Sequence, residues 1–172
     1  MKSKIRIAVC QSPCGELYVG SWGGRLCLCD WVGAKHHAAV IARLTRALDC
    51  EVEYTMSDCT YLAMRQLEEY FDGSRKEFDM PLMLVGTAFQ REVWQALQSI
   101  PYGRTESYSS LAGRIGRASS VRAVANANGA NALSIFVPCH RIIGSDGSLT
   151  GYAGGLDAKR YLLDFEFASS VK

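Results

Sequence analysis

The chain opens with apolar and polar residues in alternation, which is the pattern of strands in a half-buried sheet. The runs that show this alternation are residues 5–10, 17–22 and 25–31. Pro13 and Gly15 break the chain between the first two runs, and Gly23-Gly24 separates the last two by a tight turn. The pattern therefore predicts three strands, of which the second and third form a hairpin.

Apolar residues then recur every three or four positions, as they do on one face of an amphipathic helix. This spacing predicts helices over 35–48 and 59–71, the second with Ser57 as its N-cap and Asp72-Gly73 as its end. The apolar face expected for that second helix consists of Leu62, Leu67, Tyr70 and Phe71. Residues 76–80 are predicted to form a further short strand.

The second half of the chain is mostly helical in pattern. Thr87 and Gln90 have the spacing of a capping box and predict a helix that runs to about Gln98. Two short helices are predicted next, over about 108–115 and 121–128. The expected cap and turn residues are Ser107 for the first, Ser119 or Ser120 for the second, and Gly116 between them. Two short helices joined by a turn that contains glycine are typical of a helix-turn-helix.

The last segments complete the predicted fold. Residues 133–143 are expected to be extended, residues 144–155 to form a glycine-rich loop, and residues 156–167 to form a final helix. The fold class is therefore α/β (α+β), with a small N-terminal domain over 1–82 that has a mixed β-sheet and helices. A mostly helical C-terminal domain that contains the helix-turn-helix is predicted over 83–172.

The composition is that of an ordinary globular protein, with 172 residues of which 48% are hydrophobic and 21% charged. No apolar run approaches the roughly 18 residues of a membrane span, and no secretion signal is recognisable. Seven scattered cysteines are an odd number, which favours free thiols in a reducing compartment. We therefore expect a cytoplasmic protein without membrane association. We expect a monomer, because the pattern predicts no exposed apolar stripe that a second subunit would bury.

Basic residues gather in the second half of the chain. Residues 81–172 contain nine Lys and Arg against six Asp and Glu. The arginines of one short stretch, which holds the single acid Glu106, are Arg104, Arg114, Arg117 and Arg122. A basic cluster on helices is a weak indication of phosphate binding, and a solvated charged face explains it equally well.

The strongest chemical signal is Cys139, in the run Pro138-Cys139-His140-Arg141. A thiol beside an imidazole and a guanidinium can lose its proton readily, and the thiolate is the nucleophilic form. Adjacent side chains on an extended chain point to opposite sides, so a water relay between Cys139 and His140 is expected. His140 would act as the base, with a carboxylate holding its ring. The candidate carboxylates, which spacing alone does not rank, are Asp157, Asp164 and Glu166. Arg141 could stabilise the thiolate or brace the fold, and we favour the brace.

Several motifs occur together around this cysteine. Downstream of Pro138-Cys139-His140-Arg141-Ile142-Ile143 are Gly151-Tyr152-Ala153-Gly154-Gly155-Leu156, Lys159, Leu162, Leu163 and Glu166. Upstream are the segments 87–97 and 100–103, Ser107-Tyr108 and Arg122-Ala123-Val124. Over residues 87–166 the sequence resembles the O6-alkylguanine-DNA alkyltransferases, also called methylated-DNA–protein-cysteine methyltransferases. Residues 1–80 resemble the small N-terminal domain of that family only loosely.

The resemblance implies a DNA repair enzyme that works once. Cys139 would take the alkyl group of O6-alkylguanine, and possible activity on O4-alkylthymine stays open. The product would be a thioether, which is not hydrolysed, so no metal and no cofactor are expected. His140 and Glu166 would form the proton relay. Tyr108 would donate a hydrogen bond to the leaving guanine.

The resemblance also implies a partner, double-stranded DNA that carries O6-alkylguanine. The helix-turn-helix would bind the minor groove, and the damaged base would be flipped out of the stack. Arg122, at the start of the second helix, would fill the space that the base leaves. The residues assigned by the resemblance to the base pocket and its support are Tyr152, Ala153, Asn131 and Lys159.

Two positions depart from the family pattern: Ala125 stands where glycine is usual, and Ala132 where proline is common. They could alter the fit to the groove and loosen the turn after the second helix. Cys27, Cys29, His36 and His37 do not match the zinc pattern of some family members, and two cysteines on one strand face are poor tetrahedral partners, so no metal site is predicted. Two other functions stay open, a non-repairing module that binds alkylated bases and a cysteine hydrolase or acyltransferase.

Overall fold

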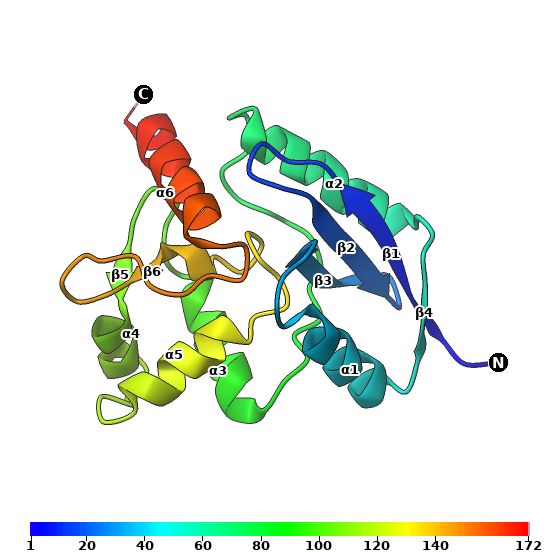
Figure 1. Cartoon of the computed structure of the whole chain (residues 1–172), viewed down its shortest axis with the longest axis horizontal. Coiled ribbons are helices and arrows are strands. Elements are labelled where there is room, and N and C mark those ends of the chain that lie inside the picture. The colour runs from blue at the N-terminus through cyan, green and yellow to red at the C-terminus, as the bar shows by residue number, and fades with distance from the viewer. Residues whose placement is uncertain (172) are drawn as a thin grey trace. The chain divides into compact units, whose positions relative to one another are not determined.

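The structure is a computed structural model, and it describes residues 1–171. It divides the chain into two compact units, Met1–Val85 and Gly86–Lys172 (Figure 1). The first unit contains a four-stranded sheet with two helices, and the second is mostly helical. None of the helices within residues 1–171 combines the length and the apolar character needed to cross a bilayer.

The sheet of the first unit is mixed, as predicted. Its strands are β1 (Lys4–Cys10), β2 (Leu17–Trp22), β3 (Arg25–Trp31) and β4 (Glu51–Glu53). They lie in the order β3-β2-β1-β4, with β1, β2 and β3 antiparallel and β4 parallel to β1. The three predicted strands are confirmed. The fourth was not predicted, because three residues with two glutamates carry no alternation of apolar positions.

Two helices cover this sheet, and both were predicted. They are α1 (His37–Leu48), which packs on β3, and α2 (Asp58–Phe71), which packs on β1, β2 and β3. Ser57 caps α2 in a reciprocal capping box with Thr60. Leu67 and Tyr70 of α2 are buried, whereas Leu62 is 48% exposed, so its place on the predicted apolar face was wrong.

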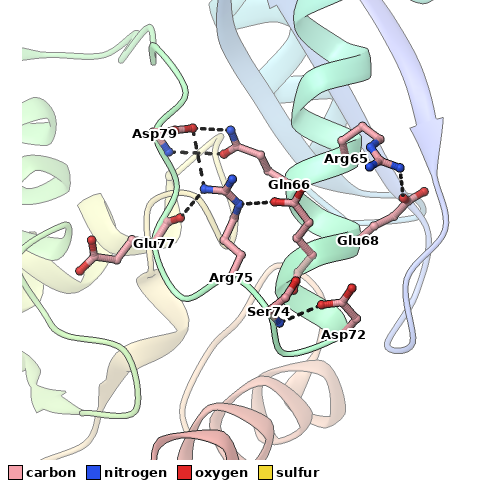
Figure 2. A network of polar contacts seen from close by, with 9 residues as sticks. Arg65, Gln66, Glu68, Asp72, Ser74, Arg75, Glu77 and Asp79 are labelled. Carbon is pink, nitrogen blue, oxygen red and sulfur yellow. Dashed lines mark hydrogen bonds and ion pairs between the residues drawn. The ribbon is translucent and has the colours of Figure 1, made fainter.

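The predicted strand over 76–80 is also wrong. That segment is irregular, and polar side chains hold it against α2 (Figure 2). Arg75 donates to the carboxylate of Glu69 at 2.7 Å, and the amide of Gln66 donates to Asp79. Arg75 also donates to the Glu77 carbonyl at 2.9 Å, and the Asp79 amide donates to Gln66 Oε1 at 3.4 Å. Because side chains satisfy these backbone groups, the segment does not depend on a neighbouring strand.

The two cysteines of β3 are buried in the sheet. A register shift interrupts the pairing of β2 with β3 beside Cys27, so the regular alternation expected through Cys27 and Cys29 is broken there. Burial raises the pKa of the Cys27 thiol to about 12, as expected of an inert core cysteine. Within residues 1–171, no three or more His, Cys, Asp or Glu side chains are grouped to hold a metal ion.

The second unit is built from four helices and a two-stranded sheet. The helices are α3 (Ala88–Leu97), α4 (Tyr108–Arg114), α5 (Val121–Gly129) and α6 (Leu156–Ser170), and the strands are β5 (Glu106–Ser107) and β6 (Ile142–Ile143). The strands pair in parallel. The predicted capping box of α3 is present, with Thr87 and Gln90 bonded to each other's backbone. Helix α6 extends three residues beyond the predicted end.

Helices α4 and α5 pack against each other, which is consistent with the predicted helix-turn-helix, and α5 also packs on α3. Gly116, in the turn between them, has φ 74°, a conformation that favours glycine. Ser107 caps α4 through its side chain, as predicted. Ser120 occupies the N-cap position of α5, but its hydroxyl makes no capping bond. Trp94 of α3 donates its indole N–H to the Ala127 carbonyl at 2.8 Å and fixes α5 in place.

Candidate active site

Cys139 lies in a turn, not in an extended segment. It begins a short 3-10 helix, η1 (Cys139–Arg141), in which the Arg141 amide donates to the Pro138 carbonyl at 3.0 Å. The prediction that residues 133–143 are extended throughout is therefore wrong at these three residues, and also at residues 135–136, which form a turn. Cys139 is 5% exposed. Because the turn changes the directions of adjacent side chains, the argument that Cys139 and His140 must point to opposite sides does not apply.

The approach to the cysteine is a tight, buried turn. The Val137 amide donates to the Leu133 carbonyl at 2.8 Å, and Ile135, inside the turn, has φ 74°. A β-branched residue rarely adopts this conformation, which costs on the order of 1–3 kcal/mol. Ile135 is fully buried, so packing holds the strained turn in place. The backbone that delivers Cys139 is thus rigidly defined.

Asn131 braces this segment from the end of α5. Its side-chain amide donates to the Val137 carbonyl at 3.0 Å and to Cys139 Sγ at 3.1 Å. Its oxygen accepts from the Leu133 amide at 2.9 Å. An N–H that points at sulfur stabilises the anion more than the neutral thiol. The helix-turn-helix and the cysteine are therefore joined through one buried amide.

His140 is fully buried and paired with Glu166 of α6. The distance from His140 Nε2 to Glu166 Oε1 is 2.7 Å. Burial lowers the pKa of His140, against the opposing charge of Glu166, so the imidazole is neutral at pH 7. No hydrogen bond from the described residues reaches its other nitrogen, Nδ1. That nitrogen is therefore available to take a proton.

Arg141 completes the cluster. Its Nε donates to Glu166 Oε2 and its Nη2 to Glu166 Oε1, both at 2.9 Å, and its Nη1 donates to the Ile100 carbonyl at 2.6 Å. The favoured role of Arg141 as a brace matches these contacts. Burial alone would raise the pKa of Glu166, but the charges and hydrogen bonds of His140 and Arg141 hold it well below its usual range.

The buried pair predicts how stability changes with pH. Both Glu166 and His140 have pKa values that are lower in the folded protein, so the unfolded chain binds more protons on acidification. His140 begins to destabilise the fold below about pH 6.5, and the stabilisation from Glu166 is lost below about pH 4.3. We expect the urea midpoint to fall steadily from pH 7 to pH 4. A midpoint that rises over this range would contradict the assignment.

A second group of contacts orders the loop between β6 and α6. The fully buried Lys159 donates from Nζ to the Thr150 carbonyl at 2.9 Å. The Tyr108 hydroxyl lies 3.4 Å from the same carbonyl and 3.4 Å from Thr150 Oγ1. Burial lowers the pKa of Lys159, and the neighbouring Cys139 opposes that shift. Lys159 is thus in the electrostatic neighbourhood of the sulfur.

The structure brings together most, but not all, of the predicted site residues. Those joined by contacts are Cys139, Asn131, His140 and Glu166 in one cluster, and Tyr108 and Lys159 around Thr150. Tyr152 and Ala153 lie in the same glycine-rich loop as Thr150, residues 144–155. Arg122 is exposed on α5, and no ion pair or hydrogen bond ties its side chain to the described residues.

Thr150 was not predicted as a site residue. Its only signal in the sequence is its position two residues before Tyr152 in the loop. A threonine in a glycine-rich loop is ordinary turn chemistry, so nothing in the pattern distinguishes it.

Comparison with known proteins covers both units. One family model, 6-O-methylguanine DNA methyltransferase, ribonuclease-like domain, matches residues 5–84, and a second, the DNA binding domain of the same family, matches residues 88–168. The crystal structure of Mycobacterium tuberculosis O6-methylguanine methyltransferase superposes with a TM-score of 0.82 at 38% identity, covering 96% of this chain and 94% of that one. The chain belongs to the 6-O-methylguanine DNA methyltransferase family. Its predicted fold class is confirmed by this match.

Relatives within the 6-O-methylguanine DNA methyltransferase family match over part of the chain. A methylated-DNA–protein-cysteine methyltransferase of Mycolicibacterium paratuberculosis is 56% identical over 104 residues, which are 60% of this chain and 63% of that protein. The constitutive enzyme of the same name from Bacillus subtilis is 53% identical over 105 residues, 60% of this chain and 64% of that protein. The chain thus spans less than two thirds of the length of these two relatives. A structure of the Mycobacterium tuberculosis protein in complex with DNA superposes with a TM-score of 0.81 at 38% identity, covering 95% of this chain and 94% of that one.

Proposed function

We propose that the protein repairs alkylated DNA by transferring the alkyl group of O6-alkylguanine to its own Cys139. The observation that carries the proposal is the buried Cys139 sulfur, which accepts from the Asn131 amide and is followed in the chain by His140, whose ring is held by Glu166. The family membership and the names of the relatives support the same activity. The direct test is the mass of the protein after reaction with a methylated duplex.

The residues around Cys139 can supply each proton movement. One water between the sulfur and His140 Nδ1 would carry the thiol proton to the imidazole, and Glu166 would stabilise the imidazolium. The thiolate attacks the alkyl carbon and forms the C–S bond. The C–O6 bond breaks, and its electron pair stays with the guanine. A neutral guanine is restored when a ring nitrogen takes the proton of the Tyr108 phenol.

The reaction ends after one transfer. A thioether is not opened by water as a thioester would be, so Cys139 stays alkylated and the molecule is spent. This outcome separates the proposal from a cysteine hydrolase, which would return a free thiol after each turnover. A non-repairing module would have no use for the relay of His140 and Glu166.

Double-stranded DNA is the proposed partner, bound through α4 and α5. The base must leave the stack to reach Cys139, and Arg122 would fill its place. Arg122 suits this role because it is exposed, is free of ion pairs within the described residues and lies in the first turn of α5. Tyr152 and Ala153 would line the pocket for the extruded base. Lys159 would hold the loop that carries them.

Arg122→Ala is expected to slow repair of duplex DNA by on the order of tenfold or more, because the helix loses the side chain that replaces the base. Alkyl transfer from free O6-benzylguanine should change by less than about twofold, since no base pair has to open. Rates of Cys139 alkylation on the two substrates give the comparison. Arg25→Ala, which removes an exposed arginine from the other unit, is the matched control. Equal losses on both substrates would remove Arg122 from the proposed role.

A further inference from the structure

Thr150 is a junction of three contacts. Its carbonyl accepts from Lys159 Nζ at 2.9 Å and faces the Tyr108 hydroxyl at 3.4 Å. Its own hydroxyl, Oγ1, also lies 3.4 Å from the Tyr108 hydroxyl and can donate to it. Lys159 is fully buried on α6, so the Thr150 peptide is anchored to a rigid element. Thr150 therefore offers the Tyr108 phenol both a hydrogen-bond donor, its hydroxyl, and an acceptor, its carbonyl.

We propose that Thr150 is a positioning residue for the Tyr108 phenol, and that its hydroxyl assists the transfer of the phenol proton to the leaving guanine. The inference rests on the proposed function, because it concerns the same alkyl transfer. It adds a residue that neither the sequence motifs nor the relay around Cys139 contains. The chemical contribution lies in the side chain of Thr150, which a glycine or an alanine would lack.

The two contacts of the phenol have different fates in the reaction. In the resting protein the Tyr108 proton faces the Thr150 carbonyl. When the guanine is in place, that proton turns to the ring nitrogen, while the phenol oxygen still accepts from Thr150 Oγ1. As the C–O6 bond breaks, the proton moves to the guanine, and a phenolate remains until solvent returns a proton. A hydroxyl that donates to this oxygen is stabilising at the moment when negative charge develops on it.

The geometry fits a contact that tightens during the reaction. At 3.4 Å both distances are longer than a formed O–H···O bond of about 2.7 Å. Catalytic hydrogen bonds are often long in the free protein and shorten when substrate is bound. Tyr108 is half-buried at the start of α4, and Thr150 is exposed in the loop, so rotation of the two side chains can close the gap while Lys159 holds the Thr150 peptide.

The test uses the full chain, a duplex oligonucleotide that contains O6-methylguanine, and single-turnover rates of Cys139 methylation. Thr150→Val keeps the shape and removes the hydroxyl, and it should slow transfer on the order of tenfold. Thr150→Ser restores the hydroxyl and should recover the rate to within about threefold. In a Tyr108→Phe background, Thr150→Val should have less than about a twofold effect, because its partner oxygen is gone.

Controls separate this role from a structural one. Thr55→Val changes an exposed threonine in the other unit and should methylate Cys139 at the wild-type rate. The Thr150→Val protein should react with iodoacetamide at Cys139 at the wild-type rate, because that reaction uses no phenol. The inference is overturned if Thr150→Val matches the wild type, if Thr150→Ser is as slow as valine, or if valine slows the Tyr108→Phe protein equally. Failure of the proposed function looks different, because the wild-type protein itself would then gain no methyl group.

Discussion

Incubation with a duplex that contains O6-methylguanine is expected to add one methyl group, about 14 Da, to the intact protein. Peptide mapping should place the added mass on Cys139, and Cys139→Ala should gain none. The physical reason is that a tight turn holds this sulfur in a buried position next in the chain to His140, with the Asn131 amide donating to it. Burial raises the pKa of five thiols in the first unit, which keeps them protonated: Cys10, Cys14, Cys27, Cys50 and Cys59. Intact-protein mass spectrometry makes the measurement.

Cys14→Ala is the matched control, because it removes a half-buried thiol from the first unit. It should be methylated as completely as the wild type. The amount of methyl transferred should never exceed one per molecule, even with excess DNA. Demethylated DNA produced in many turnovers by unmodified protein would favour a hydrolase. Tight binding to the damaged duplex without any transfer would favour the non-repairing module.

Glu166→Gln is expected to lower the free energy of unfolding by about 3–5 kcal/mol, the usual cost of removing one partner of a buried ion pair. It should also abolish most of the alkyl transfer. The neutral amide removes the charge that balances Arg141 and turns one acceptor for His140 or Arg141 into a donor. Urea unfolding measures the stability, and methylation at a urea-free, low temperature measures the activity.

The control for that substitution is Glu92→Gln. Glu92 pairs with Arg117 at 3.4 Å on the surface, with both side chains about half exposed, so its loss should cost less than about 1 kcal/mol. Similar losses of unfolding free energy in the two variants would show that the buried carboxylate stabilises the fold no more than the exposed one. A stable Glu166→Gln protein that still transfers methyl groups at the normal rate would exclude Glu166 from the relay.

Local sequence rules predicted the helices that begin at a residue whose side chain caps them. Helices α2 and α3 were predicted with their caps, because Ser57 and Thr87 satisfy backbone groups within a few residues. The rules failed where distant side chains decide the backbone. Residues 76–80 have a strand-like composition, yet the side chains of Gln66 and Arg75 bond their backbone and hold the segment as a loop.

The same distinction holds for the site. Cys139 and His140 stand out in the sequence as neighbours, but their 3-10 turn depends on packing and on Asn131. Glu166 could be preferred over the other carboxylates only through the family resemblance, since 26 residues separate it from His140. Thr150 has no sequence signal beyond its place two residues before Tyr152, because its proposed role comes from contacts that the fold creates.

One carboxylate ties three distant parts of the second unit together. Glu166 on α6 holds His140 and Arg141, and Arg141 in turn holds the Ile100 carbonyl after α3. Opening the imidazole to solvent therefore requires the C-terminal helix to detach as well. Amide hydrogen exchange in α6 and in the cysteine turn should accordingly proceed through a single cooperative opening, with similar protection in both.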